Sequence, residues 1–301
     1  MTLPTPLHPC DKIALIAPCS PVDPTQIEPA ADFIRELGYT PVIFPSCYAR
    51  KHYLAGDDLT RAKDINDAFA DPDIKAVIAM RGGYGSARLD KFLDCDIIRA
   101  NPKIFCGYSD VTVLHAILNQ RCGLVTFHTP MPGIAEAREH SRSRDCLAAV
   151  LRGEFPRELT AFGEPLNVLC EGTAEGILTG GNLTVVASTV GTPYQWETEG
   201  RILFLEDVGE RAYAIDRALL HLRDGGLLET CAGILLGTWQ DCTPPVGATF
   251  DEMFREWFAP LGIPVISGLP CGHSVPSLSL PLGCRVSIDG GTVSVFARAG
   301  R

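Results

Sequence analysis

Short apolar runs alternate with amphipathic segments along the first half of the chain. The apolar runs, of four to six residues, recur at 13–17, 41–44, 75–80, 103–106 and 124–127. Segments with helical periodicity are expected at 27–37, 57–70, from 110 to about 119, and at 142–151. Buried runs separated by helices are typical of parallel βαβ units, whose right-handed connections build a doubly wound sheet. The pattern therefore predicts an α/β domain with a Rossmann-like parallel sheet over residues 1–152.

The pattern changes after residue 152. Residues 153–176 are rich in Gly, Pro and Glu and are predicted to form a linker. Strand-like runs then recur at 202–205, 233–236, 265–267, 284–288 and 293–296, and helices are expected at 183–190, 213–222 and 250–258. The last two strands flank Asp289-Gly290-Gly291, a sequence suited to a tight hairpin. We therefore predict a second, more β-rich α+β domain over 177–301.

Composition narrows the class of protein. A length of 301 residues fits two moderate domains, and 46% hydrophobic with 21% charged residues excludes a mainly disordered chain. The formal net charge of -10 argues against a general nucleic-acid binder, which needs a basic surface. It carries no information about small-molecule substrates.

The cysteines indicate a reducing compartment. The chain has 12 of them, scattered and without any Cys-x-x-Cys pair, so neither a zinc site nor a thioredoxin-like motif is expected. The N-terminal sequence lacks the pattern of a secretory signal, and no run of 18 apolar residues predicts a membrane span. We expect a cytoplasmic protein with reduced thiols, and no metal or cofactor.

Ser109 is the first candidate for chemistry. It lies where the strand at 103–106 turns directly into a helix, between Gly107 and Asp110. A serine on such a turn projects its hydroxyl above the sheet edge, where backbone N–H groups can stabilise an oxyanion. Val111 stands where the Gly-x-Ser-x-Gly motif needs its last glycine, so the match is partial. An N-cap serine that only starts the helix is the alternative.

A glycine-rich loop ends the neighbouring strand. Arg81-Gly82-Gly83-Tyr84-Gly85 is expected at the same rim of the sheet as Ser109. Glycines allow close backbone approach, which a second oxyanion donor or a ligand-cradling turn requires. A phosphate-binding loop is less favoured, because the sequence lacks Gly-x-x-x-x-Gly-Lys.

A nucleophilic serine needs a base and a carboxylate that orients it. Of the seven histidines, His128 follows the fifth strand and His273 lies in a Gly/Pro/Ser-rich loop, and spacing does not choose between them. Glu206 and Asp207 end the apolar strand at 202–205, with Glu210 one turn later. A carboxylate at a strand end can accept an imidazole N–H and fix its tautomer. A solvated acidic loop is the alternative.

Taken together, these segments resemble the LD-carboxypeptidases, the serine peptidase family of muramoyltetrapeptide carboxypeptidases and microcin-C self-immunity peptidases. The resemblance covers nearly the whole chain. Its motifs are, in order, Arg81-Gly82-Gly83-Tyr84-Gly85-Ser86, Gly107-Tyr108-Ser109-Asp110, Gly180-Gly181-Asn182-Leu183, Leu205-Glu206-Asp207 and Gly272-His273.

The resemblance implies a Ser–His–Glu triad of Ser109, His273 and Glu206. It also implies an oxyanion hole from the backbone N–H groups of Asp110 and Gly83. The family has a Rossmann-like N-terminal domain and a C-terminal domain with a barrel-like sheet, is usually homodimeric, and places its active site between the domains.

Candidate substrate contacts follow from the same motifs. They are Arg81, Gly82, Tyr84, Asn182 and His128. Family members often carry His-Gly-Pro after the fifth strand, whereas this chain has His128-Thr129-Pro130, a departure that bears on substrate specificity. Arg81 or Arg88 is the candidate clamp for a substrate carboxylate.

The resulting hypothesis is a serine carboxypeptidase acting on a small peptide. It hydrolyses the amide between an L-centred residue and a terminal D-amino acid, such as the D-alanine of a murein tetrapeptide, in cell-wall recycling. One alternative is a peptidase like the microcin-immunity enzymes, which cleaves a toxic aminoacyl-nucleotide or peptide conjugate. A further alternative is a noncatalytic binder of murein peptides.

Overall fold

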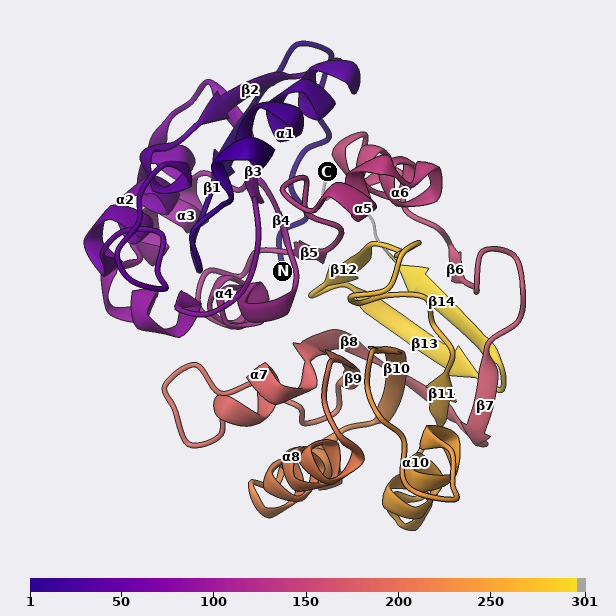
Figure 1. The fold of residues 1–301 in the computed structure, drawn as a ribbon. Coiled ribbons are helices and arrows are strands. Elements are labelled where there is room, and N and C mark those ends of the chain that lie inside the picture. The colour runs from indigo at the N-terminus through magenta and orange to yellow at the C-terminus, as the bar shows by residue number, and fades with distance from the viewer. Residues whose placement is uncertain (297–301) are drawn as a thin grey trace. The chain divides into compact units, whose positions relative to one another are not determined.

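The computed structural model describes residues 1–296, which form two compact units (Figure 1). Unit 1 comprises residues 1–155 and 275–281, and unit 2 comprises residues 156–274 and 282–296. The chain therefore returns to unit 1 for a short segment near its end. The second domain was predicted to reach residue 301, and residues 297–301 lie outside the described part.

Unit 1 is built on a six-stranded sheet in the order β12-β5-β4-β3-β1-β2. Its strands are β1 (Lys12–Ile16), β2 (Thr40–Ile43), β3 (Ile74–Ala79), β4 (Ile104–Gly107), β5 (Thr126–His128) and β12 (Leu280–Leu282). The five strands from β1 to β5 pair in parallel, and most of their residues are buried. The predicted parallel α/β sheet is confirmed, and β12 is an addition that the pattern did not indicate.

Helices connect these strands. They are α1 (Pro24–Glu36), α2 (Asp58–Ala70), α3 (Cys95–Ala100), α4 (Thr112–Gln120), α5 (Ala135–Glu139) and α6 (Ser141–Leu151), with short 3₁₀ turns η1 (Pro45–Cys47), η2 (Ser86–Phe92) and η3 (Ser109–Val111). Acidic N-caps start several of them. Before α2, the Asp57 side chain accepts a hydrogen bond from the Thr60 N–H at 2.8 Å and so satisfies one of the helix's unpaired donors.

Unit 2 contains an eight-stranded mixed sheet in the order β6-β14-β13-β8-β9-β10-β11-β7. Its strands are β6 (Glu158–Leu159), β7 (Asn167–Cys170), β8 (Thr173–Asn182), β9 (Ile202–Val208), β10 (Gly233–Gln240), β11 (Val265–Ser267), β13 (Arg285–Asp289) and β14 (Thr292–Phe296). The four strands from β8 to β11 are parallel, whereas the flanking strands pair antiparallel. The hairpin expected at Gly290-Gly291 joins β13 to β14, with Asp289 opposite Thr292.

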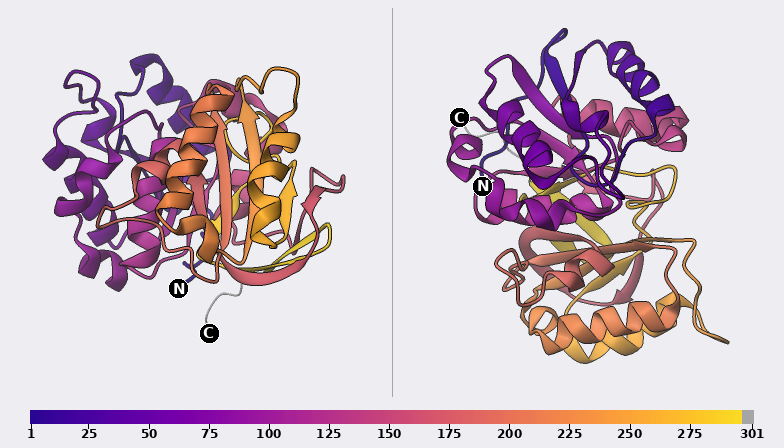
Figure 2. Two further views of the ribbon diagram at one scale, coloured as in Figure 1. Left: turned by 90° about the horizontal axis from the view of Figure 1, so that it is seen from below. Right: turned by 60° about the vertical axis from the view of Figure 1, so that its left-hand side comes forward.

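Helices α8 and α10 lie together on one side of the central strands of unit 2, as the views of Figures 1 and 2 show. The helices of this unit are α7 (Leu183–Ser188), α8 (Ala212–Asp224), α9 (Leu227–Thr230) and α10 (Phe250–Phe258), followed by the 3₁₀ turn η4 (Ala259–Leu261). A capping box starts α10, because Thr249 accepts from the Glu252 N–H and the Glu252 carboxylate accepts from the Thr249 N–H.

The segment 153–176, predicted as a linker, differs from that prediction. It carries β6, β7 and the first residues of β8. β6 and β7 are the two outermost strands of the sheet, and such edge strands are often short and rich in polar residues. The Gly, Pro and Glu residues that surround these two short strands in the segment therefore concealed them. Within residues 1–296, no helix is both long and apolar enough to cross a membrane.

A fully buried histidine ties α4 to the sheet of unit 1. His115 Nε2 lies 3.0 Å from the Gly107 carbonyl oxygen of β4, so this nitrogen carries the proton and donates. Nδ1 then accepts from the Thr126 hydroxyl of β5 at 2.8 Å, and that hydroxyl accepts from Asn119 Nδ2 at 3.0 Å. Burial lowers the pKa of His115 to about 4, because the apolar surroundings disfavour the charged imidazolium.

This histidine makes stability depend on pH. As the pH falls from about 6.5 towards 4, the unfolded chain takes up a proton at His115 before the folded protein does, which destabilises the fold by up to about 3 kcal/mol. Urea denaturation should show the free energy of unfolding decreasing across this window, and decreasing less for His115→Gln. His8→Gln replaces an exposed histidine and should keep the wild-type slope. If the free energy of unfolding depends on pH as steeply in His115→Gln as in the wild type, His115 is not the source of this pH dependence.

Candidate active site

Ser109 stands on a strained turn at the carboxyl end of β4. It has φ +65°, a left-handed conformation that is uncommon for a residue other than glycine. The turn η3 begins at Ser109 and leads directly into α4. Such a turn lifts the serine hydroxyl out of the sheet, as in the strand-to-helix turns that carry nucleophiles. An N-cap residue needs only an extended backbone, so starting the helix does not by itself require this left-handed conformation.

The backbone of Gly82 lies directly against Ser109. A Cβ atom at Gly82 would stand 2.7 Å from Ser109 Cβ, 2.8 Å from its Oγ and 3.2 Å from the backbone nitrogen of Asp110. No side chain fits there, so glycine is required by close approach. Gly83 follows with φ +108°, and a Cβ there would stand 2.3 Å from Ser20 Oγ. The loop after β3 thus meets the turn after β4, as expected for the rim of a parallel sheet.

Ser20 is a residue that sequence reasoning missed. Its N–H donates to the Gly82 carbonyl at 3.2 Å, and its hydroxyl accepts from the Tyr84 N–H at 3.1 Å. Both peptides that flank Gly83 are therefore held by one residue. Its position beyond the end of β1, at the same rim as Gly82 and Ser109, was the available signal.

Asp110 uses its side chain for structure. The buried carboxylate accepts from the Ser86 N–H through Oδ2 at 2.8 Å, and the Ser86 hydroxyl donates to the Asp110 carbonyl at 2.5 Å. This reciprocal pair joins Ser86 to the residue that follows Ser109. The Asp110 backbone nitrogen lies close to the loop after β3, 3.2 Å from the position that a Cβ at Gly82 would take.

The other candidates in unit 1 occupy different environments. Arg81 is half-buried and donates to the Pro21 carbonyl at 3.1 Å, whereas Tyr84 is exposed, with its ring centroid 5.9 Å from that of Tyr53. His128 pairs with Gly107 across β4 and β5 and is 1% exposed. The His128 ring is therefore surrounded by other residues of the protein. One of them is Tyr108, whose ring centroid lies 5.8 Å from that of His128.

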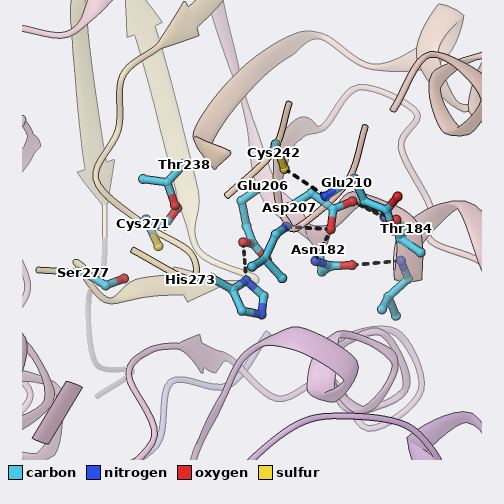
Figure 3. A network of polar contacts seen from close by, with 12 residues as sticks. Asn182, Thr184, Glu206, Asp207, Glu210, Thr238, Cys242, Cys271, His273 and Ser277 are labelled. Atoms are coloured by element: carbon cyan, nitrogen blue, oxygen red, sulfur yellow. Dashed lines mark hydrogen bonds and ion pairs between the residues drawn. The ribbon is translucent and has the colours of Figure 1, made fainter. Parts of the chain in front are cut away.

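Unit 2 supplies a histidine–carboxylate pair. His273 Nδ1 lies 2.8 Å from Glu206 Oε2 (Figure 3). Glu206 is fully buried near the end of β9, and the His273 side chain is 14% exposed. Burial raises the pKa of Glu206, and the hydrogen bond and charge of His273 act in the opposite direction. The geometry suits a carboxylate that fixes the imidazole tautomer and stabilises the imidazolium.

The neighbouring carboxylates have other partners. Asp207 accepts from Asn182 Nδ2 at 2.8 Å through Oδ1, and from the Thr184 hydroxyl at 2.8 Å through Oδ2 (Figure 3). Adjacent residues of a strand face opposite sides, which separates Asp207 from Glu206. Glu210 lies beyond the strand, where its N–H contacts Cys242 Sγ at 3.4 Å. Of the three carboxylates considered, Glu206 is the one that meets His273.

Asn182 serves as a structural cap. Its Oδ1 accepts from the Val185 N–H at 3.1 Å and starts α7, while its Nδ2 donates to Asp207. The residue is 4% exposed. The motif Gly180-Gly181-Asn182 therefore joins the end of β8 to the carboxylate network of β9.

Two glycines make room for Glu206. A Cβ at Gly272, which has φ +135°, would stand 2.5 Å from Glu206 Oε2 and 2.7 Å from Thr238 Oγ1. A Cβ at Gly237 would stand 2.3 Å from the Cys271 carbonyl oxygen and 3.0 Å from Glu206 Cβ. The requirement at Gly237 was missed, because a single glycine inside an apolar strand carries no distinctive sequence signal.

The family models identify both halves of the chain. Residues 13–129 match the LD-carboxypeptidase N-terminal domain, and residues 175–288 match the LD-carboxypeptidase C-terminal domain. The chain belongs to the LD-carboxypeptidase family. It is accordingly a serine-type LD-carboxypeptidase, which confirms the resemblance drawn from its motifs.

Individual relatives of this LD-carboxypeptidase span nearly its full length. The probable murein peptide carboxypeptidase of Bacillus subtilis is 36% identical over 302 residues, covering 99% of this chain and 94% of the relative. The murein tetrapeptide carboxypeptidase of Pseudomonas aeruginosa is 32% identical, covering 93% of each. The microcin C7 self immunity protein MccF in complex with aspartyl sulfamoyl adenosine superposes with a TM-score of 0.89 at 26% identity, covering all of both chains.

The space at Gly272 gives a direct test of the histidine–carboxylate pair. In Gly272→Ala the new methyl group collides with Glu206 Oε2, so we expect the His273–Glu206 hydrogen bond to break. The measurement is the low-field Nδ1 proton resonance of His273 by NMR, which should disappear. Gly163→Ala is the matched control, because Gly163 has φ +105° but no atom within 4 Å of its Cβ position. A resonance that persists in folded Gly272→Ala contradicts the expected collision.

Proposed function

We propose that this LD-carboxypeptidase hydrolyses the amide between an L-centred residue and a terminal D-amino acid, with Ser109 as nucleophile, His273 as base and Glu206 as its orienting carboxylate. The observation that carries the triad is the 2.8 Å hydrogen bond between His273 and the fully buried Glu206. The strained turn of Ser109, closed in by Gly82, supports the choice of nucleophile.

The reaction proceeds in two halves. Ser109 Oγ attacks the amide carbonyl carbon while His273 Nε2 takes the hydroxyl proton, and the carbonyl oxygen becomes an oxyanion that accepts from the N–H groups of Asp110 and Gly83. Collapse breaks the C–N bond, and His273 returns the proton to the leaving amine. Water, deprotonated by the same histidine, then hydrolyses the acyl-enzyme and frees Ser109. Because Ser109 belongs to unit 1 and His273 to unit 2, the mechanism requires the two units to bring them within hydrogen-bond reach.

The proposed substrate is a murein tetrapeptide, from which terminal D-alanine is released. The names of the Bacillus and Pseudomonas relatives support this choice. Of the two arginines considered for the terminal carboxylate, Arg88 is already held by both oxygens of Asp58, at 2.8 and 2.9 Å. Within residues 1–296, Arg81 forms no salt bridge, which favours it as the clamp. Gly82, Tyr84, Asn182 and His128 complete the proposed substrate-side residues.

A second candidate is cleavage of an aminoacyl-nucleotide conjugate. The structural likeness to MccF bound to aspartyl sulfamoyl adenosine favours it. Both reactions use the same triad, so only the substrate distinguishes them.

The cellular setting is part of the proposal. The 12 cysteines all lie within the described residues and none forms a disulfide, which is consistent with reduced thiols in the cytoplasm. There the enzyme would meet recycled wall fragments. We expect a homodimer, as in the family, without a nucleic-acid or membrane partner.

Substrate preference and nucleophile can be tested together. Murein tri-, tetra- and pentapeptides and an aminoacyl sulfamoyl adenosine are incubated with the protein, and the products are identified by mass spectrometry. We expect loss of one D-alanine from the tetrapeptide alone, and a decrease in kcat of at least about 10⁴-fold for Ser109→Ala and His273→Ala. His221→Ala, on an exposed histidine of α8, is the control. Cleavage of the nucleotide conjugate alone favours the second candidate, and no cleavage with intact binding indicates a noncatalytic murein-peptide binder.

The low-pH side of the pH–activity profile, its acid limb, should depend on Glu206. Burial raises its pKa above the ordinary range, so the carboxylate is neutralised at a higher pH than an exposed glutamate as the pH falls. In Glu206→Gln we expect kcat to fall by about 10²–10⁴-fold. We also expect the acid limb of kcat/KM to move to lower pH, because the imidazolium loses its anionic partner. Glu210→Gln should keep the wild-type profile, and an unmoved limb in Glu206→Gln excludes the assigned role.

A further inference from the structure

Arg61 is a charged residue in the interior of unit 1, outside the proposed triad. It lies in the first turn of α2 and its side chain is fully buried. Nη1 donates to the Pro18 carbonyl at 2.6 Å and to the Gly85 carbonyl at 2.8 Å. Nη2 pairs with Asp58 on the same helix. One guanidinium thus binds two loops that are far apart in sequence.

These two loops are the ones that enclose Gly83. Two residues beyond Pro18, Ser20 binds the Gly82 carbonyl and the Tyr84 N–H. Two residues beyond Gly83, Gly85 presents its carbonyl to Arg61. The hydrogen bonds of Ser20 and Arg61 therefore close a ring that runs from loop 18–20 to loop 82–85. The peptide that carries the Gly83 N–H, the proposed oxyanion donor, is part of this ring.

The local sequence is adapted to admit the guanidinium. Gly85 has φ +125°, and a Cβ there would stand 2.7 Å from Arg61 Nη1. Asp58 compensates the buried charge and is itself held by Arg88. Apolar side chains of similar volume often stabilise a fold at least as well as a buried ion pair. Stability alone therefore gives little reason for an arginine here, whereas its fork of donors can hold two carbonyls at fixed positions.

We propose that Arg61 is a positioning residue for the oxyanion hole, which fixes the Gly83 peptide beside Ser109 by binding the Pro18 and Gly85 carbonyls. This inference rests on the proposed function, because it assumes that the Gly83 N–H stabilises an oxyanion. Arg61 acts by holding the two loops, and in this proposal it does not contact the reacting atoms itself. Displacing such a donor raises the barrier of the chemical step more than it weakens substrate binding.

Arg61→Met and Arg61→Lys test this role. A lysine keeps the charge and can donate to one or both carbonyls, whereas methionine removes the donors. Lys103→Met is a matched control, since Lys103 is also buried in unit 1 and donates to the Ala68 and Asp71 carbonyls at the other end of α2. For each protein the kcat and KM on murein tetrapeptide, the rate of labelling by a fluorophosphonate, and the Tm are measured. Hydrogen exchange of segments 17–22 and 81–86 is followed by mass spectrometry.

Arg61→Met should lower kcat and the labelling rate about 10- to 100-fold, with KM changed less than about threefold. Arg61→Lys should recover part of the loss, and exchange in both segments should accelerate in Arg61→Met only. Lys103→Met should lower Tm yet keep kcat within about twofold. A folded Arg61→Met with kcat within twofold of wild type overturns the proposal, as does an equal loss in Lys103→Met. Should Arg61→Met not fold, a labelling rate in Arg61→Lys that is identical to that of Lys103→Met overturns it.

The proposed function fails by a different result. If the wild-type protein neither cleaves the tetrapeptide nor labels at Ser109, the hydrolytic assignment is wrong. The exchange comparison still decides whether Arg61 holds the two loops, because it needs no activity.

Discussion

In both units a proposed catalytic side chain occupies the space that a Cβ atom would need, so only glycine fits at Gly82 and Gly272. At Gly82 the missing Cβ leaves room for the hydroxyl of Ser109, and at Gly272 it leaves room for the carboxylate of Glu206. In the proposed mechanism the Ser109 hydroxyl gives up its proton, and the Glu206 carboxylate accepts a hydrogen bond from His273. Each glycine thus lets the chain pass a proposed catalytic group with no side chain between them.

Three buried ionisable groups are stabilised in the interior in three different ways. His115 is kept neutral, because both of its ring nitrogens are used by neutral partners. Arg61 keeps its charge through a carboxylate and two carbonyls. Glu206 has a partner, His273, whose own charge changes during the proposed reaction. Burial makes each arrangement specific, since an unpaired charge in the interior costs several kcal/mol.

Much of the fold could be predicted from the sequence, because strands β1 to β5 are continuous apolar runs between amphipathic helices. β6 and β7 could not, since they are edge strands of two and four residues in a segment rich in Gly, Pro and Glu. β12 was missed because Leu280–Leu282 joins a sheet whose other strands end at residue 128.

The candidate site likewise contains residues whose positions could be predicted from the sequence and residues whose positions could not. Ser109 and the Gly82-Gly83 loop follow strands whose ends must share a rim, so their proximity follows from topology. The choice of Glu206 over Asp207 depends on which face of β9 meets the His273 loop, and no spacing encodes that. Arg61 resembles any charged residue of an amphipathic helix until its burial is seen.

The return of β12 to the first sheet bears on how the protein is made. Until residues 280–282 have left the ribosome, β5 is the outermost strand of an incomplete sheet with an unpaired edge. Exposed strand edges invite pairing with other chains. The sheet that carries Ser109 is therefore completed only after residues 280–282 have been translated, and both Glu206 and His273 precede them in the chain.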